Sequence, residues 1–183
     1  MVPTLYFLRS SEQKITTDIL PFAYRLDELD KTLEDIDGLG IYSEFYGLSG
    51  KDLGLYALVD NKIAGAAWIR LLKESDSANA FIDEKTPVLT IGVLPEFRSK
   101  GIGSAMLEQL LLEAGSFYGR ISVSVLNSDE RVKFFEKLGF TILDNSNKKS
   151  PADASDTITM VKSVTSEAVI RPSDGYDPKR WMD

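Results

Sequence analysis

The sequence predicts an α/β (α+β) fold in which helices cover both faces of a mixed, twisted sheet. Along its 183 residues, segments of alternating or β-branched apolar residues are separated by segments whose apolar residues follow a helical spacing. Apolar residues make up 43% of the chain and charged residues 27%, which is typical of one globular domain with a substantial core. The predicted element order is β-α-α-β-β-β-α-β-α-β-β.

Seven stretches fit the strand patterns. They are residues 4–9, 55–59, 63–71, 88–94, 120–126, 140–143 and 157–164. The second and third flank Asp60-Asn61-Lys62, which is a hairpin signature. Polar residues between 73 and 85 and between 144 and 155 predict loops.

Four stretches are predicted to be helical. The first begins at Thr16 or Thr17, either of which can cap it, and tolerates Pro21 in its first turn. The second in the predicted order falls in the acidic segment 27–44. The others extend from Gly101 or Ile102 to about Tyr118, and from Ser128 or Asp129 to a stop at Gly139.

A strand, a basic glycine-bearing turn and a helix follow one another between residues 88 and 118. Pro95 ends the strand because it cannot donate to a sheet. The first N–H groups of a helix lack internal partners and carry partial positive charge, and Gly101 and Gly103 let a ligand approach the backbone. Arg98 and Lys100 add formal charge. The turn therefore predicts a phosphate site; the alternative is a plain connection with two incidental glycines.

A second stretch, Arg131 to Phe140, is typical of a short helix followed by a strand. Together the two stretches resemble the GNAT-type N-acetyltransferases. The acetyl-CoA loop of that family follows Arg/Gln-x-x-Gly-x-Gly/Ala, which residues 98–103 match. Its later motif, Phe/Leu-Tyr-Glu-Lys-Leu-Gly-Phe, is matched at 134–140 except at Phe135. The motifs lie within 88–140, and the order of the flanking elements extends the resemblance to about residues 1–165.

The resemblance implies a GNAT-like acyl-CoA N-acyltransferase fold, with a mostly antiparallel sheet of about seven strands. It implies acetyl-CoA as cosubstrate and a primary amine that attacks the thioester directly. The backbone of Ile91, Gly92 and Val93 would pair with the pantetheine arm at a splay between strands, and the Val93 N–H would stabilise the oxyanion. The other implied cofactor residues are Arg98, Ser99, Lys100, Gly101, Ile102, Gly103, Ser104, Asn127 and Phe134. The alternative for residues 91–93 is a purely structural core strand.

The acid and base of the reaction are not identified by the motifs. The chain has no histidine, and the central strand offers no carboxylate. Glu96 lies beside the turn and is expected to be solvated. Phe135 stands where the family has its tyrosine acid, so Phe134 and Phe135 are predicted to be packing residues or channel walls. The family's asparagine would fall at Ser128, one residue after Asn127. A non-catalytic acyl-CoA-binding regulatory module is therefore the alternative to an enzyme.

Segment 27–44 carries seven acids and one base, which accounts for nearly all of the net charge of −7. Such a cluster could attract a positively charged acceptor, such as a polyamine-like amine, a lysine side chain or a basic peptide N-terminus. The alternative is a solvated helix face. Tyr24, Tyr42 and Tyr46 are candidates for the acceptor wall or for packing. The acidic balance argues against nucleic-acid binding.

The absence of cysteine and histidine excludes disulfides and argues against a metal site. No run of apolar residues is long enough for a transmembrane helix, and no signal peptide is evident, which predicts a cytoplasmic protein. The expected domain covers residues 1–165. Residues 166–183 form a C-terminal tail, whose part from Val169 to Asp183 is expected to dock on a folded surface, its own or a partner's, with a free tail as the rival. A homodimer is a separate prediction.

Overall fold

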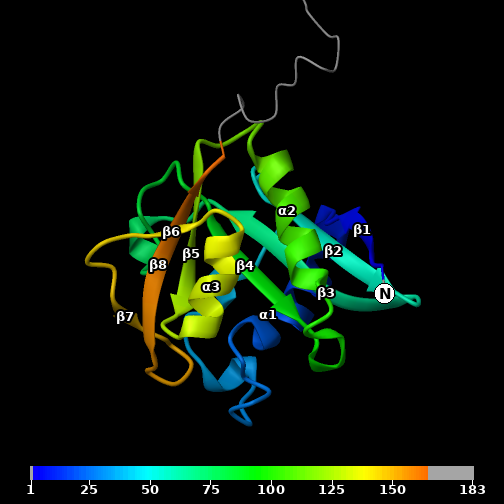
Figure 1. Cartoon of the computed structure of the whole chain (residues 1–183), viewed down its shortest axis with the longest axis horizontal. Helices are drawn as coiled ribbons and strands as arrows, with labels where there is room; N and C mark the ends of the chain where they lie inside the picture. The colour runs from blue at the N-terminus through cyan, green and yellow to red at the C-terminus, as the bar shows by residue number, and fades with distance from the viewer. Residues whose placement is uncertain (1, 165–183) are drawn as a thin grey trace, which may run out of the picture.

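The computed structural model describes residues 2–164, and within them helices cover both faces of an eight-stranded sheet (Figure 1). The strand order is β1-β2-β3-β4-β5-β8-β6, with β7 also paired to β8. The strands are β1 (Thr4–Phe7), β2 (Leu53–Val59), β3 (Lys62–Arg70), β4 (Val88–Val93), β5 (Arg120–Leu126), β6 (Thr141–Ile142), β7 (Lys148–Lys149) and β8 (Asp156–Ser163). Every pairing is antiparallel except that of β4 with β5. The predicted mixed, mostly antiparallel fold is confirmed.

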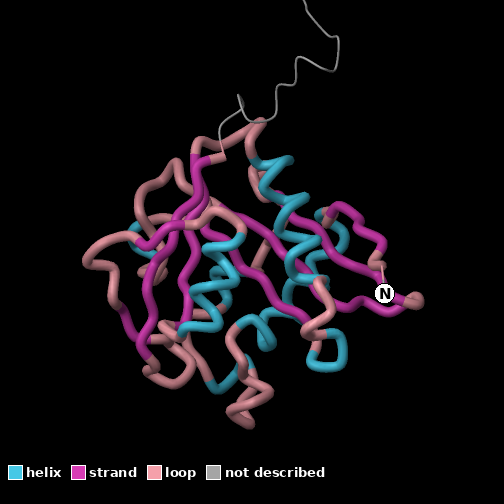
Figure 2. Tube along the Cα trace, in the orientation of Figure 1, coloured by secondary structure: helices cyan, strands magenta, loops and turns pink. Residues whose placement is uncertain are grey.

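Within the described residues, three α-helices and five short 3-10 helices accompany the sheet. The α-helices are α1 (Gln13–Ala23), α2 (Ile102–Ala114) and α3 (Asp129–Lys137). The 3-10 helices are η1 (Ser10–Glu12), η2 (Leu33–Asp35), η3 (Gly40–Tyr42), η4 (Glu74–Asp76) and η5 (Pro95–Phe97). Figure 2 shows the long stretch of loops and short helices that separates α1 from β2.

Two apolar cores lie on opposite faces of the sheet. Helices α2 and α3 close one face, where Met106, Leu110 and Phe135 pack against the strands. Helix α1 and the segment that follows it close the other face, where Leu20 and Trp68 are buried. Successive side chains of a strand point to opposite faces, so the apolar strands β3 and β4 serve both cores.

The first helix begins earlier than predicted. Helix α1 follows directly from η1 and starts at Gln13, so the Thr16 hydroxyl donates to the Gln13 carbonyl (2.6 Å) instead of capping the helix. Pro21 consequently lies near the end of α1 rather than in its first turn. The proline removes one N–H donor, the helix continues to Ala23, and the chain turns away at Tyr24 and Arg25, the latter at a positive φ of 57°.

The acidic segment 27–44 forms no α-helix, which corrects the predicted second helix. Positive φ angles at Asp30 (55°) and Gly38 (86°) interrupt any helical run. Only the short 3-10 helices η2 and η3 form between Asp30 and the start of β2. Buried Leu26 and Leu39 anchor the segment to the core. Its carboxylates therefore do not share a helix face.

The remaining elements follow the predictions closely. Asp60 and Asn61 both have positive φ, as the tight turn of the β2–β3 hairpin requires. The Ser128 hydroxyl caps α3 by accepting the Arg131 N–H, and Gly139 ends the helix region with a φ of 94°. Strand β7 is an addition, because two residues of the predicted loop 144–155 pair with β8.

Two further predictions concern a membrane-spanning helix and the C-terminal tail. None of the helices among residues 2–164 is long and apolar enough to cross a membrane. The predicted docking of the tail, 166–183, lies outside the described residues.

Candidate active site

Strands β4 and β5 separate after a short parallel contact. Only Val88↔Ser122 and Leu89↔Val123 are paired, although both strands continue. Strand β4 stays paired with β3 as far as Val93. The Leu94 N–H donates to the Ala64 carbonyl (2.8 Å), and strand groups alternate in direction, so the N–H groups of Ile91 and Val93 point away from β3. The splay thus leaves one edge of β4 open at the centre of the sheet.

A cavity of about 370 Å³ lies along this open edge, and we call it the cofactor cavity. Its floor is the end of β4, and its sides are the turn before α2 and the first half of α3. Ten of the predicted cofactor residues line it, namely Ile91, Gly92, Val93, Arg98, Ser99, Gly101, Ile102, Gly103, Ser104 and Phe134. The residues predicted from two separate motifs are therefore brought together.

The turn at the mouth of the cofactor cavity presents free backbone donors. Helix α2 has no side-chain cap at Gly101, and the first return hydrogen bond is from the Ala105 N–H to the Gly101 carbonyl. The N–H groups of Ile102, Gly103 and Ser104 are thus left without helical partners. Gly101 has a φ of 79°, which side chains rarely tolerate. These donors suit the oxygen atoms of a phosphate.

Gly103 leaves a gap between α2 and α3. A Cβ atom built at this glycine would lie 3.5 Å from the Phe134 ring and 3.8 Å from the Val93 side chain. Its backbone needs no unusual φ. The absence of a side chain therefore keeps the cavity open and is not required by the backbone conformation. This is expected where a narrow ligand such as a pantetheine arm passes.

Arg98 is engaged with protein groups rather than pointing freely at the turn. Its Nε donates to the Val93 carbonyl (3.0 Å), and its guanidinium pairs with Glu28 (3.3 Å) and Asp27 (3.8 Å). The side chain remains 30% exposed. Arg98 thereby joins the predicted phosphate turn to the start of the acidic segment.

Two predicted cofactor residues lie outside the lining of the cofactor cavity. Lys100 is exposed, and its ammonium donates to the Glu96 carbonyl (3.1 Å). Asn127 is also exposed, and its backbone N–H donates to the Asp156 carbonyl. Glu96 is exposed too and borders neither cavity, which fits the expectation that it is solvated.

A second cavity, of about 100 Å³, lies where β4 and β5 diverge, and we call it the splay cavity. It is bordered by both strands, the end of α1, Tyr42 and the turn at Ser150 and Pro151. Ile91, Arg131 and Phe135 border both cavities, so the two are adjacent. An acceptor in the splay cavity would meet a cosubstrate arm on β4 at this shared wall.

Phe135 forms part of that shared wall. The ring is 6% exposed and packs edge-on against Phe134 (ring centroids 5.0 Å apart) and Phe140 (5.4 Å). It supplies apolar surface and no proton donor, as predicted for a packing or wall residue.

Two of the three candidate tyrosines border the splay cavity. Tyr24 and Tyr42 lie there with ring centroids 5.6 Å apart, and burial raises the pKa of both hydroxyls. Tyr46 instead belongs to the core around Trp68. At neutral pH the two tyrosines are therefore neutral hydrogen-bonding groups.

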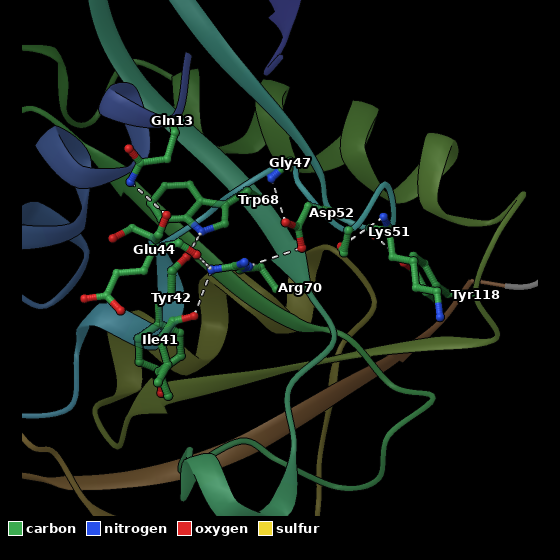
Figure 3. Close-up of polar contacts among 12 residues, drawn as sticks. Gln13, Ile41, Tyr42, Glu44, Gly47, Lys51, Asp52, Trp68, Arg70 and Tyr118 are labelled. Carbon is green, nitrogen blue, oxygen red and sulfur yellow. Dashed lines mark hydrogen bonds and ion pairs between the residues drawn. The ribbon is translucent and has the colours of Figure 1, made fainter. Parts of the chain in front are cut away.

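Polar groups of β3 hold Tyr42 and its neighbours in place (Figure 3). The Trp68 indole donates to the Tyr42 carbonyl (2.6 Å). Arg70 donates to the carbonyls of Ile41 (3.0 Å) and Glu44 (2.7 Å) and pairs with Asp52 at 3.2 Å. This wall of the splay cavity is thus fixed by a largely buried network.

Sequence reasoning missed the cationic residues of the splay cavity. Arg25 and Arg131 border it, and no carboxylate does among the residues that the structure describes. Arg131 begins the second stretch but lies three residues before its motif at 134–140, and Arg25 stands in no motif. Only the folded chain brings them together. Within residues 2–164, no cluster of three or more His, Cys, Asp or Glu is placed to hold a metal.

Comparisons with known proteins identify the family. Residues 51–142 match the family model described as an acetyltransferase (GNAT) domain. The chain is 25% identical over 149 residues to a probable N-acetyltransferase, san, of Drosophila melanogaster, covering 78% of this chain and 70% of that protein.

Two solved structures share the fold. A GNAT superfamily phosphinothricin acetyltransferase from Sinorhizobium meliloti, in complex with AcCoA, is 18% identical and superposes with a TM-score of 0.65 over 97% of each chain. A GNAT family acetyltransferase from Elizabethkingia anophelis with acetyl-CoA bound gives a TM-score of 0.57 at 19% identity, over 88% of this chain and 97% of that one.

Proposed function

The chain belongs to the GNAT acetyltransferase family, with acetyl-CoA as its cosubstrate, and from this premise we propose that it moves the acetyl group directly to a primary amine. The observation that carries the proposal is the open edge of β4 beside a turn of free N–H donors. An extended arm could lie along that edge while its pyrophosphate meets the turn. The family assignment makes the chain an acetyltransferase rather than a non-catalytic acyl-CoA-binding module.

The residues of the cofactor cavity have separate parts in the proposal. The amides of Ile102, Gly103 and Ser104 would hold the pyrophosphate, and the backbone of Ile91 and Val93 would pair with the pantetheine arm. The Val93 N–H would face the carbonyl oxygen on which negative charge develops. One such preorganised donor typically contributes about 3 kcal/mol to lowering the barrier.

The transfer forms a C–N bond to the neutral amine and breaks the thioester C–S bond. The departing thiolate takes up the proton that the amine nitrogen loses and leaves as the CoA thiol. A lysine-like amine is neutral in only about one molecule per thousand at pH 7, so the site must favour the neutral form. No carboxylate among the described residues borders the splay cavity. The ammonium proton must therefore pass to water or to a group outside this lining before the amine attacks. A coenzyme A thiol is acidic enough to leave without an enzyme acid, so Phe135 is no obstacle.

Thiol release from acetyl-CoA, measured against a panel of amines, tests the proposal. At least one primary amine should accelerate thiol release, with an equal amount of N-acetylated product. The Gly103→Leu variant is the control, because it fills the cofactor cavity without straining the backbone. A protein that binds acetyl-CoA but acetylates no amine would overturn the transfer proposal.

A positively charged acceptor stays a prediction that this same panel tests. Its main support, the acidic segment, is partly used inside the protein, because Asp27 and Glu28 pair with Arg98 and Asp35 accepts the Thr32 N–H. Association into a homodimer and docking of the tail also stay predictions. Truncation after Ser166 should lower the melting temperature if the tail docks on its own domain, or change the solution mass if it docks on a partner.

A further inference from the structure

We propose that the acceptor carries a negatively charged group, a carboxylate or a phosphate, beside its amine, and that Arg131 binds this group in the splay cavity. The inference rests on the proposed amine acetylation and names the class of amine. Three observations about charge support it. They are the charged residues that border the cavity, the ion pairs of the neighbouring arginines, and the ion pairs that hold carboxylates of the acidic segment outside the cavity.

The formal charge that borders the splay cavity is entirely positive among the residues described. Arg25 enters from the end of α1 and Arg131 from the first turn of α3. The remaining polar groups that border it are hydroxyls, which include Ser124 on β5 and Tyr24. Guanidinium and hydroxyl groups are hydrogen-bond donors to a carboxylate or phosphate, and Arg suits the planar, two-oxygen geometry of either.

Arg131 differs from the arginines around it. Arg25 pairs with Glu28 (3.4 Å) and Asp153 (3.3 Å), and Arg98 pairs with Asp27 and Glu28. The Arg131 guanidinium has no ion pair or side-chain hydrogen bond with any residue of the described range 2–164. Among these three arginines, only Arg131 has a guanidinium without a partner within residues 2–164.

The surroundings of Arg131 add to its positive field. Neighbouring protein atoms partly desolvate the guanidinium and lower its pKa, as does the charge of Arg25 and, to a lesser extent, that of Arg98. The carboxylates of Glu28 and Glu130 oppose this shift. The group stays protonated, because the pKa of an arginine starts far above neutrality. Arg131 is an exposed residue, so a ligand can reach its guanidinium, and the like-charged neighbours favour an anion beside it.

The acidic segment does not cancel this field at the cavity. Asp27 and Glu28 are its members nearest the arginines, and both are held outside the splay cavity by Arg98 and Arg25. The same cationic wall would repel a second ammonium group on the acceptor. An acceptor with an anionic group therefore gives Arg131 the ion-pair partner that the described residues do not supply.

The position of Arg131 also identifies the rival explanation. It borders the cofactor cavity as well as the splay cavity, so its partner could be a phosphate of the cosubstrate instead of the acceptor. The two sources differ in what a substitution changes. Loss of an acceptor contact affects anionic acceptors alone, whereas loss of a cosubstrate contact weakens acetyl-CoA binding for every acceptor.

Matched amines test the inference in the full-length protein. Glycine is compared with glycinamide, and 2-aminoethyl phosphate with ethanolamine, with ethylenediamine as the cationic member. Each anionic amine should exceed its neutral partner in kcat/KM. The Arg131→Gln variant should lower kcat/KM for the anionic amine about tenfold or more and leave the neutral amine and the KM for acetyl-CoA within about twofold. Lys133→Gln is the control, because it removes an exposed charge from the same helix without touching either cavity.

A binding measurement separates the inference from the proposed function. Glycine and 2-aminoethyl phosphate are titrated calorimetrically into protein saturated with CoA, which cannot react. Binding that Arg131→Gln weakens, without thiol release from any amine, would support the anion site and overturn acetyl transfer. Acetylation of neutral or cationic amines with no preference for an anion would overturn the anion site and leave acetyl transfer standing. An equal loss for all acceptors with a raised KM for acetyl-CoA assigns Arg131 to the cosubstrate, and failure of both anions to bind or react also overturns the inference.

Discussion

The two adjacent cavities are built in different ways. The cofactor cavity is made mainly from one continuous stretch, 91–104, and its useful groups are backbone N–H donors and absent side chains. The splay cavity is made from side chains that come from α1, η3, β4, β5, α3 and the turn before β8. A cavity that acts through backbone groups leaves a local pattern of glycines in the sequence. A cavity whose side chains come from six segments leaves no such pattern. Substitutions should therefore act on one cavity without the other.

The largest expected effect concerns the wall of the splay cavity. Arg70→Met removes the bonds that hold the segment around Tyr42 and leaves Asp52, which is 3% exposed, without its cation (Figure 3). Breaking such a buried pair should cost about 3 kcal/mol of unfolding free energy. Denaturant unfolding measures it, and acceptor KM should rise while the affinity for acetyl-CoA is kept.

Arg120→Met is the matched control for that substitution. Arg120 pairs with Asp83 near the surface, where the two side chains are 41% and 47% exposed. An exposed pair should contribute at most about 1 kcal/mol. Equal losses of unfolding free energy in the two variants would show that the Arg70 pair contributes no more than an exposed pair. An equal rise of acceptor KM in both would contradict the assignment of the Arg70 network to the cavity wall.

The next effect belongs to the cofactor cavity. Gly103→Leu places a side chain against Phe134 and Val93, so acetyl-CoA affinity should fall about a hundredfold, equivalent to about 2.8 kcal/mol. The melting temperature should stay near that of the wild type because the backbone at Gly103 is unstrained. Gly119→Leu, at an exposed glycine with open space around it, controls for the added leucine. Unchanged affinity in Gly103→Leu would remove the cosubstrate from this cavity.

This contrast also explains how much the sequence could predict. The turn at 98–104 and the helix ending at Gly139 depend on local rules for glycine and helix ends, and both were predicted. The acidic segment was expected to continue as a helix, and local density of acids could not reveal that Leu26 and Leu39 would anchor it as loops. No local pattern could show that Asp27 and Glu28 would pair with Arg98 either, because Glu28 and Arg98 are 70 residues apart in the sequence. Arg131 acquires its place only when β4 and β5 separate.

A smaller effect is expected at the wall that the cavities share. Phe135→Tyr keeps the ring and adds a hydroxyl, which can reach cavity water instead of being buried without a partner. The unfolding free energy should change by less than about 1 kcal/mol, since packing against Phe134 and Phe140 is retained. Turnover should be equal or higher, because the hydroxyl stands where the family has its acid. A large loss of turnover in a folded variant would show that Phe135 has another role.

Arg98 offers a way to connect the two cavities. In the double variant Asp27→Asn/Glu28→Gln, the guanidinium loses both carboxylate partners but keeps the Val93 carbonyl. Released positive charge beside the turn should raise acetyl-CoA affinity about threefold at low salt, with a smaller gain at high salt. The Glu34→Gln/Asp37→Asn variant removes two exposed charges of the same segment and is the control. Equal gains in both variants would indicate a general charge effect instead of the release of Arg98.

The smallest effect is a pH dependence of stability at Asp153, which pairs with Arg25 beside the splay cavity. Hydrogen bonds from the Ser155 side chain and backbone, then the charge of Arg25, hold the pKa of this carboxyl below its usual range. A lowered pKa in the folded state means that the contribution is present above the unfolded pKa of about 3.9 and is lost as the pH falls through the folded value. At pH 6, wild type should therefore have a higher melting temperature than Asp153→Asn. Its unfolding free energy should be larger by at most about 1 kcal/mol, and the difference should vanish in acid.

Asp83 provides the control for this prediction. A hydrogen bond from the Lys85 backbone N–H, and then the Arg120 side chain, lower the pKa of its carboxyl. Asp83 borders neither cavity, so Asp83→Asn should show the same pH dependence of stability. Only Asp153→Asn should also change acceptor KM, because it alone loosens Arg25; a change of equal size in both variants would break the link between this carboxylate and the splay cavity.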